Sequence, residues 1–173
     1  MNYLPYAGLL RRVLLALLTT TGLLLTACKE DDAITTRDYS AIDDNLIKKY
    51  LTDKGITNAQ RQSSGLYYVP VITNATATRA VAGNTVAVLY TGQLLDGTVF
   101  DASSRHGNVP YSFVLGRGQV IAGWDEGIAL MHKGDKAVLL IPSALGYGGA
   151  GAGGGAIPPN AVLRFDVELV DVK

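Results

Sequence analysis

The pattern of apolar and polar positions changes at residue 65. From Gly65 onward, apolar residues recur at every second position, which is the spacing of strands that bury one face. The alternation is clearest at residues 163–169, where leucine, phenylalanine and valine alternate with charged side chains. Further strands are predicted at 66–69, 85–91, 111–115 and 136–141, the first ending at Pro70 and the last at Pro142. Asp96-Gly97, between two β-rich runs, predicts a hairpin.

Residues 41–53 have apolar side chains at helical spacing instead. One face of such a helix carries Ile42, Leu46, Ile47, Tyr50 and Leu51. Ser40 and Asp43 predict a capping box at the start of the helix, and Gly55 predicts its end. We expect the apolar face to pack on the domain that follows, and packing on a second copy is the alternative.

A second helix is predicted at residues 121–131, with Trp124, Ile128 and Met131 on one face. The elements together predict an α+β fold, in which a curved antiparallel β-sheet wraps around one short α-helix. A short helical stalk, the segment at 41–53, precedes this domain. An antiparallel sheet with one apolar face must cover that face, so the aromatic side chains of the strands are expected to meet Trp124 there.

The N-terminal region has the pattern of an export signal. Arg11-Arg12 precede an apolar run at 13–25, as in a secretory signal peptide, and the run is shorter than the roughly 20 residues that span a bilayer. Leu25-Thr26-Ala27-Cys28 resembles a bacterial lipobox, whose cysteine is acylated after cleavage. The predicted segments are therefore a lipoprotein signal peptide at 1–27, a tether with a short helix at 28–64, and a domain at 65–173. The alternatives are a plain signal peptide with a coincidental cysteine and a short buried helix.

The residues after Cys28 bear on location. Lys29-Glu30-Asp31-Asp32 is similar to a signal that directs lipoproteins of one group of Gram-negative bacteria to the outer face of the outer membrane. A solvated tether is the alternative. We expect the acylated Cys28 to anchor the protein to a lipid bilayer of the bacterial envelope, in the outer membrane, on its periplasmic or cell-surface face.

Charge and composition exclude several classes of function. The whole chain has a formal net charge of +0, and 13 basic and 15 acidic residues remain without residues 1–27, so nucleic-acid binding is not expected. Cys28 is the single cysteine, which excludes an internal disulfide. His106 and His132 do not have metal-ligand spacing, so no metal is expected.

Two motifs suggest other chemistry but lack the context it requires. Residues 146–151 fit G-x-G-x-x-G, yet more glycines and then Pro158-Pro159 follow, so the helix needed for dinucleotide binding cannot begin there. Asp101, Ser103, Ser104 and His106 suggest a hydrolase, but they crowd one loop, and no strand-turn-helix elbow presents a serine.

Five blocks in order resemble the FKBP-type peptidyl-prolyl cis/trans isomerases, the macrolide-binding immunophilins. These blocks are Tyr90-Thr91-Gly92 with Asp96 to Ser103, Phe113 to Gly116, Val120 to Gly127, Ala144 to Gly148, and Ile157 to Asn160 with Leu163 to Leu169. The resemblance covers residues 65–173. It implies an enzyme that rotates Xaa-Pro bonds of exported proteins during folding, in an apolar aromatic cleft and without a cofactor.

The resemblance also implies a role for each site residue. Trp124 would form the floor under the proline ring, and the Tyr147 hydroxyl and the Ile121 backbone N–H would donate to substrate carbonyls. Asp101 would polarise or orient the amide from the rim of the cleft. The walls would consist of Tyr90, Phe100, Phe113, Val120, Ile121 and Phe165, with Ile157 closing one side.

The expected partners are proline-containing polypeptides, and macrolide-type inhibitors would fit the same cleft. The protein is expected to be monomeric. One alternative is a binding module that holds proline segments with little turnover, and another is a scaffold that dimerises through the stalk. Residues 148–157 are richer in glycine than the family pattern, so this segment is expected to order on substrate binding and to affect substrate preference.

Overall fold

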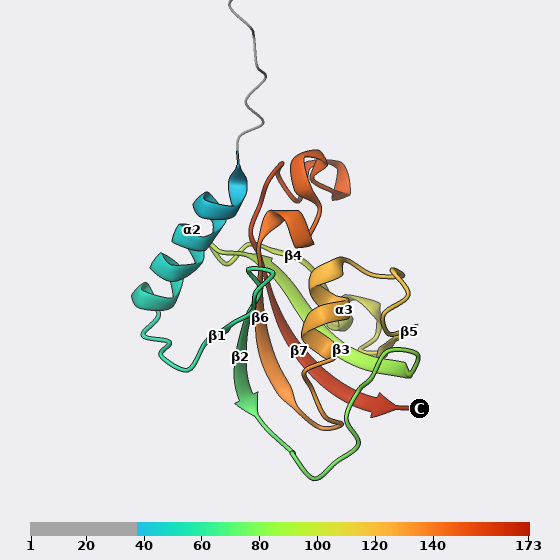
Figure 1. Cartoon of the computed structure of the whole chain (residues 1–173). Coiled ribbons are helices and arrows are strands. Elements are labelled where there is room, and N and C mark those ends of the chain that lie inside the picture. The colour runs from blue at the N-terminus through green and yellow to red at the C-terminus, as the bar shows by residue number, and fades with distance from the viewer. Residues whose placement is uncertain (1–37) are drawn as a thin grey trace, which may run out of the picture. The chain divides into compact units, whose positions relative to one another are not determined.

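The structure is a computed structural model that describes residues 38–173, so the predicted signal peptide and Cys28 lie outside the described residues. Its sheet comprises β1 (Gln60–Arg61), β2 (Tyr67–Ile72), β3 (Thr85–Leu94), β4 (Val99–Ala102), β5 (Tyr111–Val114), β6 (Lys136–Ile141) and β7 (Leu163–Val172). The strand order is β1-β2-β6-β7-β3-β4, with β5 beside β3, and every paired neighbour is antiparallel. Two α-helices complete the described fold, α2 (Tyr39–Asp53) and α3 (Ala122–Ile128), and the predicted α+β class is confirmed (Figure 1).

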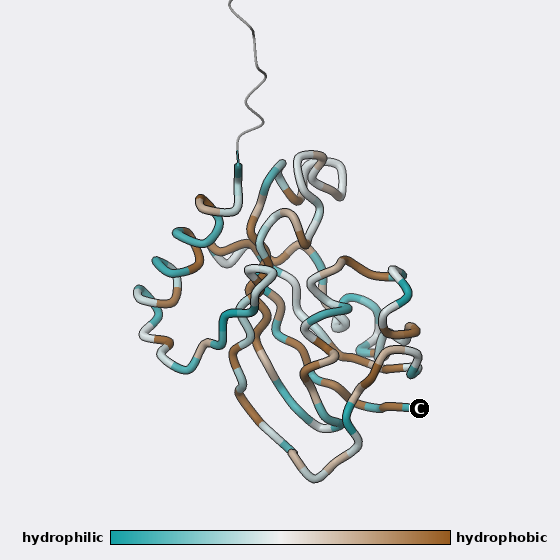
Figure 2. The backbone as a smooth tube through the Cα atoms, in the orientation of Figure 1, coloured by the Kyte–Doolittle hydropathy of each residue, from teal (hydrophilic) through white to brown (hydrophobic). Residues whose placement is uncertain are grey.

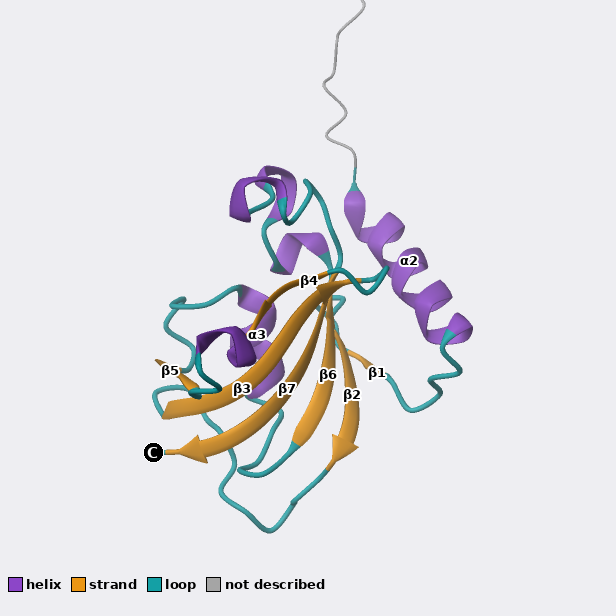
Figure 3. Cartoon of the chain, turned by 180° about the vertical axis from the view of Figure 1, so that it is seen from behind, coloured by secondary structure: helices purple, strands orange, loops and turns teal. Residues whose placement is uncertain are grey.

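The two faces of the sheet are covered by different helices. Side chains on the curved inner face, such as Leu139 and Phe165, form the main core with Trp124 and Ile128 of α3. Because side chains alternate along a strand, Val138 and Leu140 lie on the opposite face, where they pack with Ile47 and Leu51 of α2. Figure 2 shows the corresponding alternation of apolar and polar positions along the strands, and Figure 3 shows the sheet from behind.

The helix α2 packs on the domain as expected, but with a narrower apolar stripe. Ile47 and Leu51 are buried against the outer face of the sheet, whereas Ile42 and Leu46 are 38% and 46% exposed. The predicted capping box is wrong: the N-cap is Asp38, whose carboxylate accepts from the Ser40 N–H at 2.9 Å. Asp43 cannot complete such a box, because its side chain is buried and accepts hydrogen bonds from Ser143 instead.

The helix α3 is shorter than the predicted 121–131 and ends at Ile128. Beyond it the chain turns, and the Met131 carbonyl accepts from the Ala80 N–H at 3.0 Å. Gly123 and Gly127 let α3 lie close to β6, because an added Cβ would come within 2.5 Å of Ile141 Cγ2 and 2.7 Å of Leu139 Cδ1. This close packing fixes the position of Trp124 between the helix and the sheet.

Two strand boundaries depend on neighbouring strands. β2 continues through Pro70 to Ile72, contrary to the predicted end. At Pro70 the neighbour β1 has already ended, so β2 is an edge strand there and tolerates the missing N–H of proline. The Asp96-Gly97 hairpin is confirmed: the Leu94 N–H donates to the Thr98 carbonyl at 2.9 Å, and Gly97 adopts a φ of 95°.

Candidate active site

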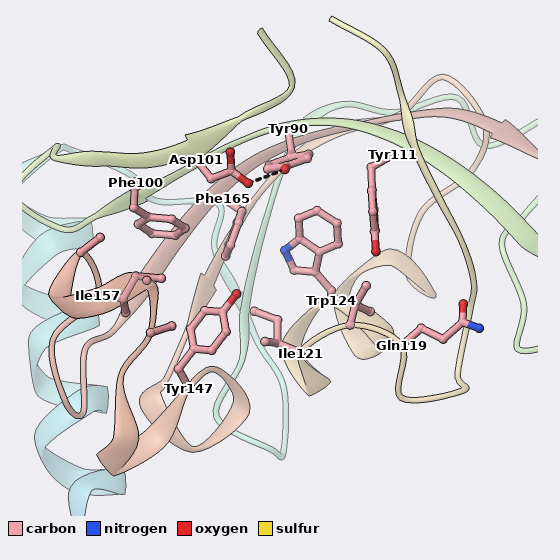
Figure 4. A pocket seen from close by; sticks show the side chains of 14 residues that line it. Tyr90, Phe100, Asp101, Tyr111, Gln119, Ile121, Trp124, Tyr147, Ile157 and Phe165 are labelled. Atoms are coloured by element: carbon pink, nitrogen blue, oxygen red, sulfur yellow. Dashed lines mark hydrogen bonds between the residues drawn. The ribbon is translucent and has the colours of Figure 1, made fainter. Parts of the chain in front are cut away.

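A cleft of about 430 Å³ opens between the inner face of the sheet, the start of α3 and the segment 147–157 (Figure 4). It is lined by Tyr90, Phe100, Asp101, Tyr111, Gln119, Val120, Ile121, Trp124, Tyr147, Ala152, Gly153, Ala156, Ile157 and Phe165. Every residue that the sequence proposed for the site lies on this lining except Phe113.

Packed aromatic rings form the floor of the cleft. Trp124, in the first turn of α3, is 5% exposed. Its ring centroid lies 5.1 Å from that of Tyr90 on β3 and 5.2 Å from that of Phe165 on β7, both edge-on. Phe100 on β4 meets Phe165 edge-on at 5.5 Å. Such edge-to-face pairs fix the rings relative to one another, so the floor is a preformed apolar surface.

Phe113 lies behind the floor rather than on a wall, which corrects the expectation from the sequence. It is 4% exposed and packs against Trp124, with 6.0 Å between ring centroids. Tyr111, two residues earlier on β5, lines the cleft and is 47% exposed. Alternation along the strand puts Tyr111 and Phe113 on the same side of the sheet, and this was the signal that could have identified Tyr111.

The carboxylate of Asp101 is fixed by three donors at the edge of the cleft. Its Oδ2 accepts from the Tyr90 hydroxyl at 2.6 Å, and its Oδ1 accepts from the Ala102 N–H at 2.8 Å and lies 2.9 Å from His106 Nε2. Partial burial favours a higher pKa for Asp101, but the hydrogen bonds from Tyr90 and His106 outweigh it and lower the pKa. Asp101 is therefore an anion at neutral pH.

Tyr147 brings a hydroxyl group into the cleft from the opposite side. Figure 4 shows its side chain reaching inward, with the oxygen towards the aromatic floor. Burial, followed by the negative charge of Asp101, raises the pKa of Tyr147, so its hydroxyl stays protonated at neutral pH. A protonated phenol in an apolar cleft can donate a hydrogen bond to a carbonyl group.

Two further N–H donors lie at the cleft without a protein acceptor. The Ile121 backbone N–H, at the N-cap of α3, makes no backbone hydrogen bond within residues 38–173. The indole Nε1 of Trp124 is buried and has no partner in the same part of the chain. The Ile121 N–H is thus free to donate to a ligand that carries a hydrogen-bond acceptor, whereas the indole nitrogen is covered by protein atoms.

The glycine-rich segment has a defined conformation. Ala152 and Ile157 exchange two backbone hydrogen bonds of 3.0 Å, which place Ile157 over one side of the cleft. Gly151 has a φ of 63°, and an added Cβ would collide with the Ile157 carbonyl oxygen. Gly151 therefore serves tight backbone packing, whereas Gly154 and Gly155 have open space around them and adopt φ of 61° and 101°. No α-helix begins in this segment; it contains only two short 3₁₀ turns, at Gly148–Ala150 and Gly153–Gly155.

The residues that suggested a hydrolase have other uses. The Ser103 hydroxyl accepts from the Tyr90 N–H at 3.0 Å and is buried, so it positions a wall of the cleft. Asp101 and His106 interact but have no serine aligned with them among their hydrogen-bond partners.

Across residues 38–173, no group of three or more His, Cys, Asp or Glu side chains could hold a metal ion. In the same residues no helix is long and apolar enough to cross a membrane.

Solved structures show that the fold is of the FKBP class. The crystal structure of FkpA from Escherichia coli superposes with a TM-score of 0.66 at 40% sequence identity, covering 79% of this chain and 60% of that one. The crystal structure of AtFKBP13 gives a TM-score of 0.62 at 37% identity, covering 68% of this chain and 100% of that one.

The sequence comparison identifies the family. The chain belongs to the FKBP-type peptidyl-prolyl cis-trans isomerases, whose family model matches residues 76–170. The "FK506-binding protein" of Neisseria meningitidis serogroup C is 55% identical over 93 residues, which cover 54% of this chain and 84% of the relative. The peptidyl-prolyl cis-trans isomerase FPR2 of Saccharomyces cerevisiae is 56% identical over 96 residues, or 55% and 70% of the two chains. The protein is accordingly a peptidyl-prolyl cis-trans isomerase.

Some residues that line the cleft were not expected from the sequence. Besides Tyr111, these are Gln119, Ala152, Gly153 and Ala156. Gln119 accepts from the Val114 N–H at 2.8 Å and so ties the loop before α3 to β5. Small residues in a glycine-rich stretch have no pattern that separates lining positions from others, so only the folded segment identifies them.

Proposed function

We propose that the aromatic cleft catalyses the rotation of Xaa-Pro bonds without forming a covalent bond to the substrate. The observation that carries the proposal is an aromatic floor at Trp124 with two donors beside it, the Ile121 N–H and the Tyr147 hydroxyl. The proline ring would lie on the indole, and the two donors would bind carbonyl groups on either side of it. This arrangement orients a peptide without any cofactor.

The physics of amide rotation explains how such a cleft accelerates the reaction. Rotation about a peptide bond has a barrier of about 18–20 kcal/mol, because the planar form gains resonance. The twisted transition state loses that resonance and much of the carbonyl dipole, so an apolar cleft disfavours it less than it disfavours the planar ground state. Each 1.36 kcal/mol of difference corresponds to about a tenfold change in rate. The fixed anion of Asp101 at the edge of the cleft would orient the amide further.

Isomerisation of a short proline peptide by residues 29–173 tests this proposal. We expect fast turnover by the unsubstituted protein and a loss of at least about tenfold in kcat/KM in the Asp101→Val, Tyr147→Phe double variant, since each change removes a polar group of the cleft. A folded protein without turnover would instead support the alternative of a module that binds proline segments.

We further propose that the enzyme acts on exported proteins and is anchored in the bacterial envelope through an acylated Cys28. The support comes from the sequence: a signal-peptide pattern at 1–27 ends at the single cysteine of the chain, and acidic residues follow at 30–32. Its substrates would then be proline-containing segments that fold outside the cytoplasm.

Metabolic labelling with a fatty-acid analogue tests the anchor. We expect label in the protein and recovery in the outer-membrane fraction, and we expect both to be lost in Cys28→Ala. Protease treatment of whole cells would distinguish the cell-surface face from the periplasmic face. An unlabelled protein in the soluble fraction would contradict the anchor while leaving the isomerase activity intact.

A further inference from the structure

The helix α2 contributes a buried carboxyl group that the reaction described above does not use. Asp43 is 1% exposed, and its Oδ2 accepts from both the N–H of Ser143, at 2.8 Å, and the hydroxyl of Ser143, at 2.6 Å. Its Oδ1 is buried and has no partner among the described residues. Burying a carboxyl group with one unpaired oxygen is unfavourable, so packing alone is a poor reason for an aspartate at this position.

Ser143 lies at a sensitive point of the chain. It follows β6 and opens a short 3₁₀ turn, Ser143–Leu145, and Tyr147 comes two residues after the turn. Within the turn the Gly146 N–H donates to the Ser143 carbonyl at 3.0 Å. The N–H at the start of a helical turn has no acceptor within the turn, and the Asp43 carboxyl supplies one from a different element.

Tyr147 is thereby held on both sides. Upstream, Asp43 fixes the turn that begins at Ser143. Downstream, the Asn160 N–H donates to the Gly148 carbonyl at 2.8 Å. At Gly146 the absence of a side chain leaves room for Leu163, since an added Cβ would come within 3.0 Å of Leu163 Cδ1.

We propose that Asp43 is a positioning residue for the active site, which acts by orienting the Ser143 turn so that the Tyr147 hydroxyl reaches the substrate carbonyl. The inference rests on the role proposed above for Tyr147. It makes the N-terminal helix part of the catalytic domain, because a side chain of α2 reaches the segment that carries a cleft residue. Small displacements of a positioned group lower reaction rates strongly, so an indirect contact of this kind can affect turnover.

Side chains other than Asp43 also attach α2 to the domain. Ile47 and Leu51 are buried against the outer face of the sheet, and Asp44 on the same helix bonds with Arg61 and Tyr67. Loss of Asp43 should therefore leave α2 in place and release the Ser143 turn. The effect of Asp43 on the position of Tyr147 can then be measured apart from a general loss of stability.

A double-mutant cycle in the full-length chain, purified in mild detergent, tests the proposal. We expect Asp43→Ala to lower kcat/KM for a proline peptide by about three- to tenfold at a temperature where the protein is fully folded, and to have no further effect when combined with Tyr147→Phe. Ser143→Ala, which removes only the hydroxyl, should give a smaller loss of the same kind, and it serves as the test if Asp43→Ala does not fold.

Leu51→Ala is the matched control, because it destabilises the same helix without contacting the Ser143 turn. We expect it to lower the free energy of unfolding and to leave kcat/KM unchanged. Full activity in both Asp43→Ala and Ser143→Ala, or losses that add to that of Tyr147→Phe, would overturn the proposal. The Tyr147 ring signals in NMR, assigned by their loss in Tyr147→Phe, should shift in Asp43→Ala but not in Leu51→Ala. This readout tests the positioning even if Tyr147 proves to have no part in turnover.

Discussion

Gly92 on β3 lies beneath the edges of two rings of the cleft floor. An added Cβ would come within 2.6 Å of Phe100 Cε2 and 2.6 Å of Phe165 Cε1, well inside van der Waals contact. Gly92 pairs with Phe165 on β7 and does not have a positive φ, so its lack of a side chain provides space for the rings. The absence of a side chain at Gly92 thus allows the Phe100 and Phe165 rings to pack against β3.

Gly92→Ala is therefore expected to lower kcat/KM markedly and to reduce the free energy of unfolding by about 1–3 kcal/mol, because both rings must move. Peptide isomerisation and urea unfolding measure the two effects. Gly149→Ala is the control, since an added Cβ there finds only an ordinary 3.7 Å contact with Asn160. Equal behaviour of the two variants would show that the rings can adapt without cost.

At the scale of elements, the attachment of α2 includes an ionic cluster around Asp44. Its carboxylate is bonded by Lys48 Nζ at 2.6 Å, Arg61 Nε at 2.7 Å and the Tyr67 hydroxyl at 2.8 Å. The hydrogen bonds from Lys48, Arg61 and Tyr67 hold the pKa of Asp44 far below its usual range. Because the folded pKa is depressed, the stabilisation is complete above the ordinary pKa near 4 and is lost as the pH falls towards the folded value.

Asp44→Asn should accordingly reduce the free energy of unfolding by about 1 kcal/mol at pH 7, a modest value because the cationic partners are largely exposed. Urea unfolding at pH 7, 4 and 2.5 checks this, with the difference between variant and unsubstituted protein shrinking as the pH falls. Asp53→Asn is a suitable comparison, since its pair with Lys49 is exposed on the same helix. A difference that stays constant with pH would contradict the ionic origin.

At the scale of the whole molecule, the folded unit begins well before the residues that the family model matches, because it includes α2. The match begins at residue 76, yet the outer face of the sheet is covered by Ile47 and Leu51 of α2. Each fully buried aliphatic side chain contributes about 1.5–3 kcal/mol. A chain without α2 would expose this face and leave Ser143 without its acceptor.

We therefore expect residues 64–173 to be less stable than residues 38–173 by at least about 3 kcal/mol and to isomerise proline peptides more slowly. Urea unfolding and peptide turnover of the two fragments give the comparison. Identical stability and turnover would mean that α2 is a spacer only.

The sequence predicted those parts of the fold that depend on short-range regularity. Alternation located the main strands, and Asp96-Gly97 located the hairpin, because each pattern spans only a few neighbouring residues. The same holds for Trp124, which helical spacing placed on the inner face of α3. Boundaries were less well predicted. β2 continues through Pro70, where the missing N–H is tolerated because β1 does not pair there. α3 stops at Ile128, and the Met131 carbonyl that follows accepts from the Ala80 N–H.

The sequence by itself determined the fold class and the chemical character of the cleft, since strand periodicity and the aromatic motifs are local features. Only the tertiary structure decided which side chains meet. Tyr111 rather than Phe113 faces the cleft, and Asp43 bonds with Ser143, 100 residues away. The physical reason is that such contacts depend on how distant elements pack. A buried carboxyl group from one helix can satisfy a turn in a remote segment without any repeating pattern in either stretch of sequence.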